Sequence, residues 1–242
     1  MPDEPATLVA AKPLYAQVRD QLTRRLVSGE WTPGMLIPSE QELARQLNVS
    51  QGTVRKALDA MTMDNLLVRR QGRGTFVAQP EDPRQLFQFF RLSSEKQQEF
   101  PESQVLKMTR VSGTKDVVKP LGLSAGDPVI RIERVRSMGG APIINEVLWL
   151  PADRFAGLVG MEHIPNNIYK LLSSKWGVTI ARADEQLHAT LASAQDALRL
   201  SCPQGHPLIA IQRVAYDLEG RPVELRQSRC LTDNVRYSVT LR

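Results

Sequence analysis

Residues 49–61 read VSQGTVRKALDAM and have the pattern of a helix with two different ends. Four apolar residues recur at i, i+3, i+4 and i+7, which is the spacing of one inward-facing helix stripe. They are Val54, Ala57, Leu58 and Met61. The helix begins, however, with the polar stretch Ser50-Gln51-Gly52-Thr53, which would fill a core poorly. Because Ser50 suits an N-cap, the pattern predicts an exposed helix end that contacts something other than the core.

A second amphipathic segment lies directly upstream, in PSEQELARQL at residues 38–47. Ser39 and Glu42 have the spacing of a capping box, and Asn48 suits a helix end because it tolerates the left-handed conformation. Two short helices separated by about three residues, the second with a polar and basic start, indicate a helix-turn-helix. In that motif the start of the second helix enters the DNA major groove, and its dipole favours phosphate. A plain helical hairpin with a capped end is the structural alternative.

The flanking segments favour a DNA-binding module over a plain helical hairpin. Upstream, apolar residues recur every four positions from Leu14 to Leu26, and Ser28-Gly29 ends that helix. Downstream, LLVRRQGRGTFVA at residues 66–78 alternates around Gln71-Gly72 and predicts a β-hairpin with basic strands and tip. A helix-turn-helix followed by a basic hairpin is a winged helix, whose glycines let the backbone approach a sugar–phosphate edge.

Composition is typical of a globular protein with a modest positive charge. The 242 residues suffice for one large domain or two ordinary ones, and 42% of them are hydrophobic. The formal net charge of +5 is compatible with an anionic partner without proving one. No signal peptide and no run of about 18 apolar residues is visible, so we expect a cytoplasmic protein with no membrane partner. Cys202 and Cys230 have no metal-ligand spacing, and we expect neither a metal nor a cofactor.

A polar, proline-containing stretch divides the chain. It indicates a linker at residues 79–85 between a first domain at 12–78 and a second at 86–242. The second domain opens with LFQFFRL at residues 86–92, which is apolar and aromatic. This segment fits either a strand of the second domain or a part of a dimer contact.

The second domain contains an internal repeat. GDPVIRIERV begins at Gly126 and GHPLIAIQRV begins at Gly205, so Arg134 and Arg213 occupy equivalent positions. Each copy reads as an alternating strand, a glycine turn and a second strand. Two such hairpins, with short helices in IYKLLSSKW and after Ser193, predict an α+β domain built on one antiparallel sheet. Over both domains the chain is of mixed α/β class.

Alternation in the first repeat strand places two arginines on the core face. Ile130 and Ile132 share that face, which continues with Arg134 and Arg136. A buried guanidinium is costly unless it is paired, so these arginines either pair with carboxylates or hold an anionic ligand. The candidate carboxylates are Glu146, Glu185 and Glu224. The alternative is that the twist of the sheet carries both arginines to solvent at the end of the strand.

The turn after this strand leaves the register open. A two-residue turn at Gly139-Gly140 would place Asn145 beside the arginines, whereas a one-residue slip would place Glu146 there. The sequence alone supports both arrangements.

Residues 13–77 resemble the DNA-binding domain of GntR-family bacterial transcription regulators. The resemblance is carried by PLYAQV, GEWTPGMLIPSE, ELA, VSQGTVRKAL and the wing QGRGTFV. It implies that the operator contacts include Gln41, Gln51, Arg55 and Gly72. The same helix start and wing add the remaining expected DNA contacts, which are Ser50, Thr53, Lys56, Arg70 and Arg73.

Two positions depart from the family pattern. The family commonly has arginine where this chain has Gln41 and Gln51. Arginine reads guanine bidentately, whereas glutamine prefers adenine. We therefore expect an operator that differs from the usual family half-site at one or two positions. Phosphate binding by both glutamines is the alternative.

Residues 86–242 resemble the UTRA effector-binding domain of the HutC subfamily within the GntR regulators. The match rests on LGLSAGDPVIRIERVR, the glycine turn, NEVLWLP and the final SRCLTDNVRYSV. Such domains look like chorismate lyase in fold and bind small, often acidic metabolites between the halves of the sheet. The resemblance implies an effector site lined by Arg134, Arg136, Glu146 and Glu224.

Together these features predict a ligand-responsive, sequence-specific transcription regulator. We expect a homodimeric repressor that a small anionic metabolite releases from a palindromic double-stranded DNA operator. The competing hypothesis is an enzyme with chorismate lyase-like chemistry on a small carboxylate. The sequence shows no nucleophile–base set, and the histidines His163, His188 and His206 are scattered, so we expect no enzyme. A nucleoid protein would need only non-specific phosphate binding and no inward-facing arginines.

Overall fold

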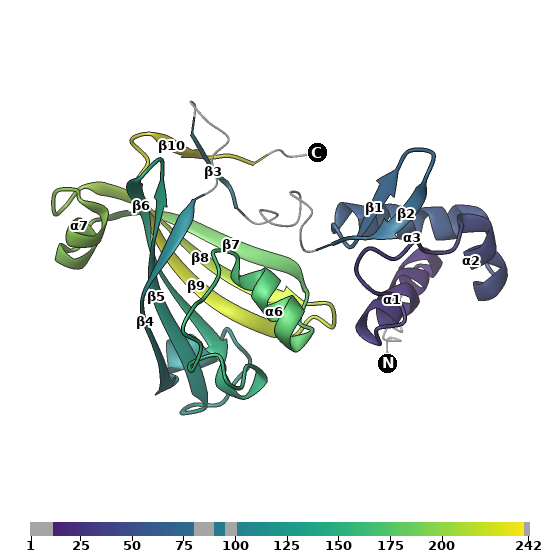
Figure 1. The fold of residues 1–242 in the computed structure, drawn as a ribbon, viewed down its shortest axis with the longest axis horizontal. Coiled ribbons are helices and arrows are strands. Elements are labelled where there is room, and N and C mark those ends of the chain that lie inside the picture. Colours follow the sequence, from purple (N-terminus) through teal and green to yellow (C-terminus); the bar gives the residue numbers. More distant parts are fainter. Residues whose placement is uncertain (1–11, 80–89, 95–100, 240–242) are drawn as a thin grey trace, which may run out of the picture. The chain divides into compact units, whose positions relative to one another are not determined.

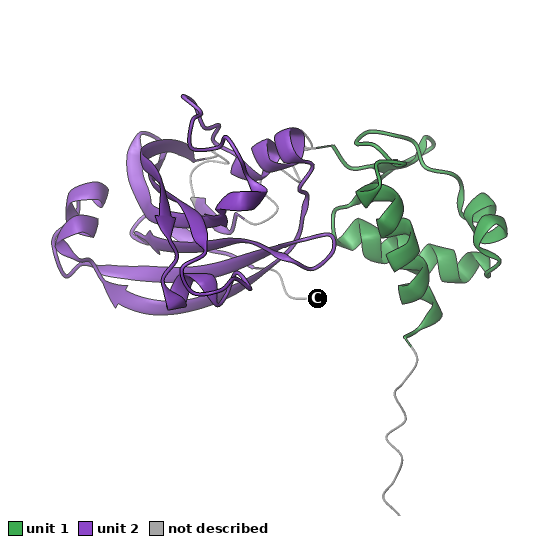
Figure 2. Cartoon of the chain, turned by 90° about the horizontal axis from the view of Figure 1, so that it is seen from below, with its two compact units in different colours: residues 1–85 green, residues 86–242 purple. Residues whose placement is uncertain are grey.

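The chain forms two compact units in a computed structural model (Figures 1 and 2). Unit 1 comprises residues 1–85 and unit 2 comprises residues 86–242. The structure describes residues 12–79, 90–94 and 101–239. Most of the expected linker therefore lies outside the described residues, and each unit is considered by itself.

Unit 1 consists of three helices followed by a two-stranded hairpin. The elements are α1 (Leu14–Val27), α2 (Glu40–Leu47), α3 (Gln51–Met63), β1 (Leu67–Arg70) and β2 (Gly74–Val77). Ser39 and Glu42 form the predicted capping box, and Asn48 is left-handed. The Ser50 side chain accepts a hydrogen bond from the backbone N–H of Thr53 and caps α3. The predicted winged helix-turn-helix architecture is confirmed.

The core of unit 1 centres on α3. Its four predicted core residues are all buried. α1 and α2 both contact α3, and Val18 and Leu22 of α1 and Leu43 of α2 are also buried. The buried apolar stripe of α1 is shorter than predicted, because Leu14, the first residue of the helix, is 53% exposed.

Unit 2 contains a six-stranded antiparallel sheet in the order β4-β5-β6-β9-β8-β7. The strands are β4 (Glu102–Ser112), β5 (Pro128–Met138), β6 (Ala141–Pro151), β7 (Ile180–Leu191), β8 (Pro207–Asp217) and β9 (Pro222–Cys230). The two repeat hairpins are β5–β6 and β8–β9, and they meet at the β6–β9 pair in the middle of the sheet. The prediction of one antiparallel sheet built from two related halves is confirmed.

Short helices and a second, two-stranded sheet complete unit 2. These elements are α5 (Lys115–Val118), the 3-10 helix η1 (Ala152–Arg154), α6 (Ile168–Trp176), α7 (Ala194–Leu200), β3 (Leu92–Ser94) and β10 (Val235–Tyr237). α6 packs on the face of the sheet that carries Ile130 and Ile132, and we call this the inner face. β3 pairs with β10, so the described end of the aromatic segment at residues 86–92 leads into a strand of unit 2.

Within the described ranges, no helix is both long and apolar enough to cross a membrane.

Candidate DNA-reading and effector sites

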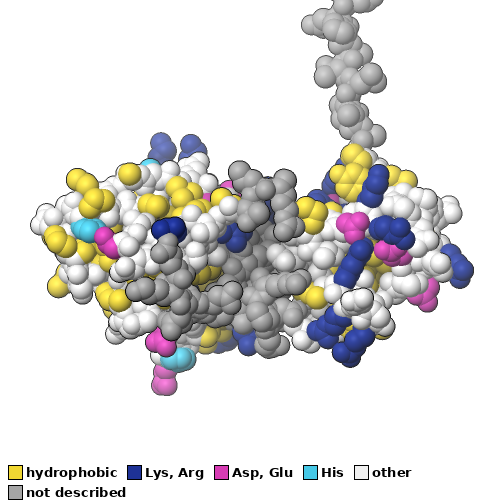
Figure 3. Space-filling view, turned by 90° about the horizontal axis from the view of Figure 1, so that it is seen from above, with side chains coloured by type: hydrophobic (Ala, Val, Ile, Leu, Met, Phe, Trp, Pro, Cys, Tyr) yellow, Lys and Arg dark blue, Asp and Glu magenta, His cyan; other side chains and the backbone are white. Residues whose placement is uncertain are grey.

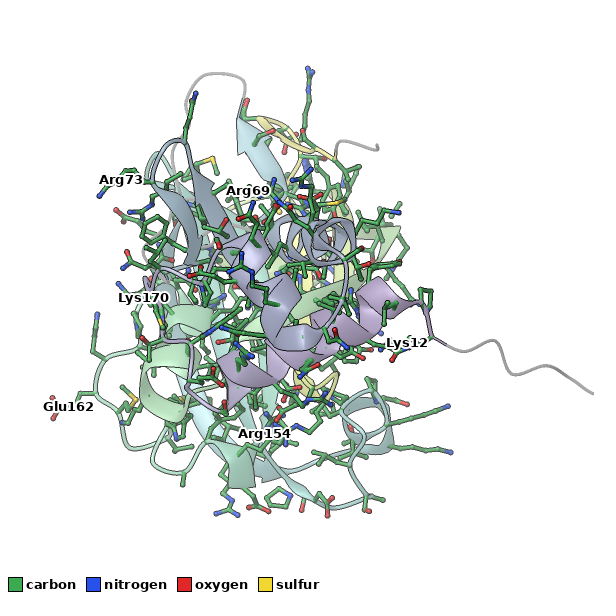
Figure 4. All side chains as sticks on the ribbon, turned by 90° about the vertical axis from the view of Figure 1, so that its right-hand side faces the viewer. Lys12, Arg69, Arg73, Arg154, Glu162 and Lys170 are labelled. Carbon is green, nitrogen blue, oxygen red and sulfur yellow. The ribbon has the colours of Figure 1, made fainter. Side chains whose placement is uncertain are left out.

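The start of α3 and the tip of the wing carry the residues expected at DNA. Gln41, Gln51, Arg55 and Lys56 are exposed on the helices. On the wing, Gly72 and Arg73 are exposed, and Arg73 projects outward from the tip (Figure 4). Lys and Arg side chains gather on the surface of unit 1, with Asp and Glu among them (Figure 3). The predicted contacts are therefore accessible to a large anionic partner.

The predicted DNA contacts Ser50, Thr53 and Arg70 also have roles within the protein. Ser50 Oγ accepts from the Thr53 backbone N–H at 3.2 Å and lies 2.8 Å from Thr53 Oγ1. The guanidinium of Arg70 lies over the ring of Phe76, 4.8 Å from its centroid. Ser50 and Thr53 thus shape the helix start, and Arg70 in β1 packs against Phe76 in the other strand of the wing.

Glu40 connects two of the predicted DNA contacts, Gln51 and Arg55, and sequence reasoning did not single it out. Its Oε2 atom accepts from Gln51 Nε2 at 3.3 Å and from Arg55 Nε at 2.9 Å. Its Oε1 atom lies 3.5 Å from Nη2 of Arg69 in the wing. These contacts exist only because folding brings α3 and β1 close to Glu40 in α2. The sequence by itself showed only that Glu40 lies at the start of a helix.

A belt of charged residues crosses the inner face of the sheet in unit 2. This polar belt consists of Arg134, Arg136, Glu146, Glu185, Arg213, Glu224 and Arg226, which are buried or nearly so. It lies between two apolar clusters, one containing Ile132 and Leu148 and the other containing Ile144 and Ile211. The pairing of the strands places the belt residues on one face, because directly opposed residues in a sheet share a face. The arginines predicted to face inward do so.

A β-bulge decides which residue faces Arg134. The hairpin keeps the two-residue turn at Gly139-Gly140, but the register shifts just before Ser137. Arg134 is consequently paired with Glu146, as the one-residue slip requires. Asn145 points to the opposite face, where it donates to Asp196 at 2.7 Å.

Arg134 and Glu146 form a buried ion pair. Both side chains are 2% exposed, and Arg134 Nε donates to Glu146 Oε1. Ser228 Oγ donates to the other carboxylate oxygen at 3.0 Å. Burial alone would raise the pKa of Glu146, but the guanidinium groups of Arg134, Arg226 and Arg136 hold that pKa well below its usual range. Glu146 is therefore a carboxylate in the folded protein.

Arg226, which sequence reasoning missed, fills the space between Glu146 and Glu224. Its Nε and Nη2 atoms donate to the two Glu224 oxygens at 2.9 and 2.8 Å, and its Nη1 lies 3.7 Å from Glu146 Oε2. Tyr169 of α6 donates to Glu224 Oε1 at 2.8 Å. Burial and the Glu224 charge raise the pKa of Tyr169 to about 12, so its hydroxyl stays a donor. The position of Arg226, two residues after Glu224 in one strand, was an available signal.

Three buried polar atoms have no hydrogen-bond partner among the described residues. They are Nη1 of Arg134, Nε of Arg136 and Oγ of Ser103. Ser103 in β4 is paired with Arg136, so the side chains of these two residues lie side by side on one face of the sheet. The Arg136 guanidinium also lies over the ring of Phe90, 4.9 Å from its centroid. Folded proteins seldom leave buried donors unsatisfied, so this end of the belt has the character of a ligand site.

Comparison with known proteins supports the family resemblance of both domains. Residues 14–77 match the model of the bacterial regulatory proteins of the gntR family, and residues 96–236 match the UTRA domain model. The chain is similar to the transcriptional repressor NagR of Bacillus subtilis, with 30% identity over 218 residues, or 89% of each chain. It is 28% identical to the histidine utilization repressor of Pseudomonas putida over 221 residues, or 88% of each.

The fold has a counterpart among solved structures that spans both units. The crystal structure of PhnF from Mycobacterium smegmatis is 26% identical, with a TM-score of 0.57, and covers 93% of this chain and 99% of that one. The GntR model and the two named repressors describe transcription regulators, which favours the regulator hypothesis over the lyase hypothesis. The chain belongs to the GntR family of bacterial transcription regulators, as a member of the HutC subfamily with an N-terminal GntR DNA-binding domain and a C-terminal UTRA domain.

Proposed function

We propose that this regulator is a cytoplasmic, homodimeric repressor that leaves its operator when a small anionic metabolite binds in the polar belt. The observation that carries the proposal is the group of buried, unpartnered donors on Arg134, Arg136 and Ser103. Relatives named as repressors support the sign of regulation. The proposed effector site is lined by Arg134, Arg136, Glu146 and Glu224.

The charge balance of the belt supports an anionic effector. The belt contains four guanidinium groups and three carboxylates, which leaves an excess of one positive charge. Burial, together with the nearby guanidinium groups of Arg134, Arg226 and Arg213, lowers the pKa of Arg136 to about 9. An anion placed beside Arg136 would balance this charge and accept from the unsatisfied donors.

DNA reading is assigned to the start of α3, the start of α2 and the wing. The proposed contacts are Gln41, Ser50, Gln51, Thr53, Arg55, Lys56, Arg70, Gly72 and Arg73. Exposure of Gln51 and Arg55 side by side on α3 supports direct reading of base edges. Winged-helix regulators of this kind read palindromic sites as dimers, and the effector acts only through its differential affinity for two dimer arrangements.

Selection of genomic DNA fragments by the purified protein, at roughly 0.15 M salt, tests the proposal. We expect one or a few palindromic sites, with adenine at positions facing Gln41 and Gln51. Recovery of the usual family guanines at those positions would contradict the adenine hypothesis. Binding without sequence preference would refute the regulator proposal in this form.

Replacing Glu40 with glutamine is expected to relax base preference where Gln51 and Arg55 read the operator. The carboxylate holds both side chains in the free protein, so its loss frees the Gln51 amide to rotate. The measurement is selection from a random DNA library with wild-type and E40Q proteins. The matched control is Asp59→Asn, since Asp59 pairs at 2.5 Å with Arg69 and contacts neither reader in the described structure. An unchanged base preference in E40Q would show that Glu40 does not position the readers.

Replacing Gly72 with alanine is expected to weaken operator binding severalfold. Gly72 has φ +70°, and an added Cβ would meet nothing within 4 Å, so the cost is backbone strain of about 1–2 kcal/mol. Relief of that strain would move the wing tip away from the DNA backbone. Gly29→Ala is the control, because Gly29 in the same unit has φ +77° and equally open space. Operator affinity is measured by fluorescence anisotropy, and equal losses in both variants would argue against a wing contact at Gly72.

A further inference from the structure

Family membership does not identify the effector. The relatives include regulators named for histidine utilization and for fructoselysine utilization, which are chemically different compounds. The contacts inside the polar belt, however, restrict what the proposed effector site accepts.

The two carboxylates predicted to line the site are already engaged. Glu224 is fully buried, and its two oxygens accept from Arg226 and Tyr169 at 2.8 to 2.9 Å. Glu146 accepts from Arg134 through one oxygen and from Ser228 through the other. Each of these two carboxylates therefore already has a guanidinium partner that balances its charge.

Among the described residues of the belt, the buried side-chain atoms that have no hydrogen-bond partner are both guanidinium nitrogens. Arg134 Nη1 and Arg136 Nε are purely donor atoms, and Ser103 Oγ can also donate. Both arginine side chains are more than nine-tenths buried. A ligand that complements these atoms supplies acceptor oxygens.

Resting on the proposed effector site, we propose that the effector is an anion rich in hydrogen-bond acceptors that carries no ammonium group. Arg226 would be the residue that sets this preference, because it lies between Glu146 and Glu224, the two carboxylates expected to line the site. A carboxylate with hydroxyl groups or a phosphate ester of a neutral sugar has this chemistry. An amino acid or an amino-sugar phosphate does not.

The physical reason is the cost of a second buried cation. An ammonium group would enter a belt that already has one excess positive charge, and each carboxylate of the described belt is already paired with a guanidinium. A buried charge without a partner loses its hydration and gains nothing in return. Two ligands that differ only in having a hydroxyl or an ammonium group should therefore differ strongly in binding affinity.

Calorimetric titration of the full-length protein with matched anion pairs tests the inference. The carboxylate pair is malate and aspartate, and the phosphate pair is glucose 6-phosphate and glucosamine 6-phosphate. In each pair a hydroxyl replaces an ammonium group on the same skeleton. We expect the hydroxyl member of a binding pair to bind at least tenfold more tightly, and the pair that binds distinguishes a carboxylate from a phosphate effector.

A variant assigns the preference to Arg226. Arg226→Gln removes the charge and keeps a donor, so the difference between the two members should shrink or reverse. Arg131→Gln is the matched control, because Arg131 lies in the same sheet with its guanidinium on Glu133, away from the belt. If R226Q does not fold, the difference in affinity between the hydroxyl and ammonium members, measured on the wild-type protein, still tests the inference about the effector.

The outcomes separate this inference from the proposed function. Equal or tighter binding of the ammonium members by the wild-type protein would overturn the inference and leave an anionic effector standing. If R226Q preferred the hydroxyl member of a pair as strongly as the wild type does, Arg226 would not be the residue that sets the preference. No binding of any of the four anions or of inorganic phosphate would overturn the anion site and the inference with it.

Discussion

Glu146→Ala is expected to lower the free energy of unfolding of unit 2 by about 3–5 kcal/mol, which is the usual cost of removing one partner of a buried ion pair. The change leaves Arg134, 2% exposed, without its carboxylate, and four guanidinium groups facing two carboxylates. For a unit of 157 residues, from 86 to 242, this corresponds to a fall in melting temperature of roughly 6–20 °C. Differential scanning calorimetry of the full chain measures it.

The control for this variant is a pair on the surface of the same unit. Asp153 is 82% exposed and lies 3.3 Å from Arg110. Asp153→Ala should change stability by no more than about 1 kcal/mol, because exposed pairs are screened by solvent. Similar losses in both variants would mean that the Arg134–Glu146 pair contributes no more than a surface contact.

Arg55→Ala is expected to weaken binding to the selected operator by about 1–3 kcal/mol, which is roughly 5- to 150-fold, with less effect on unrelated DNA. Arg55 is exposed on α3, where its Nε donates to Glu40 Oε2 at 2.9 Å, and the proposed role of this guanidinium is to read a base edge. The ratio of specific to non-specific affinity, measured by anisotropy at one salt concentration, reports the loss.

Arg24→Ala provides the matched change. Arg24 is an exposed arginine in the last turn of α1, and its loss removes the same charge from unit 1. A shared electrostatic effect would weaken both kinds of DNA equally in both variants. If R55A lowered specific and non-specific binding in parallel, Arg55 would be a phosphate contact and not a base reader.

Local sequence determined the elements and their caps. Ser39 with Glu42 and Ser50 satisfy backbone groups within one helical turn, so their neighbours alone define where α2 and α3 begin. The period of two along β5 likewise placed Arg134 and Arg136 on the buried face. Such features depend on residues a few positions apart, and they can be read without a three-dimensional structure.

Tertiary structure alone decided the partners of those side chains. The bulge before Ser137 moved Glu146, in place of Asn145, opposite Arg134, and a register slip of one residue has no sequence marker strong enough to predict it. Glu40 meets Gln51 and Arg55 only because three elements converge on it. Electrostatic pairing depends on distance in space, and distance in space is a property of the packed elements and not of sequence neighbours.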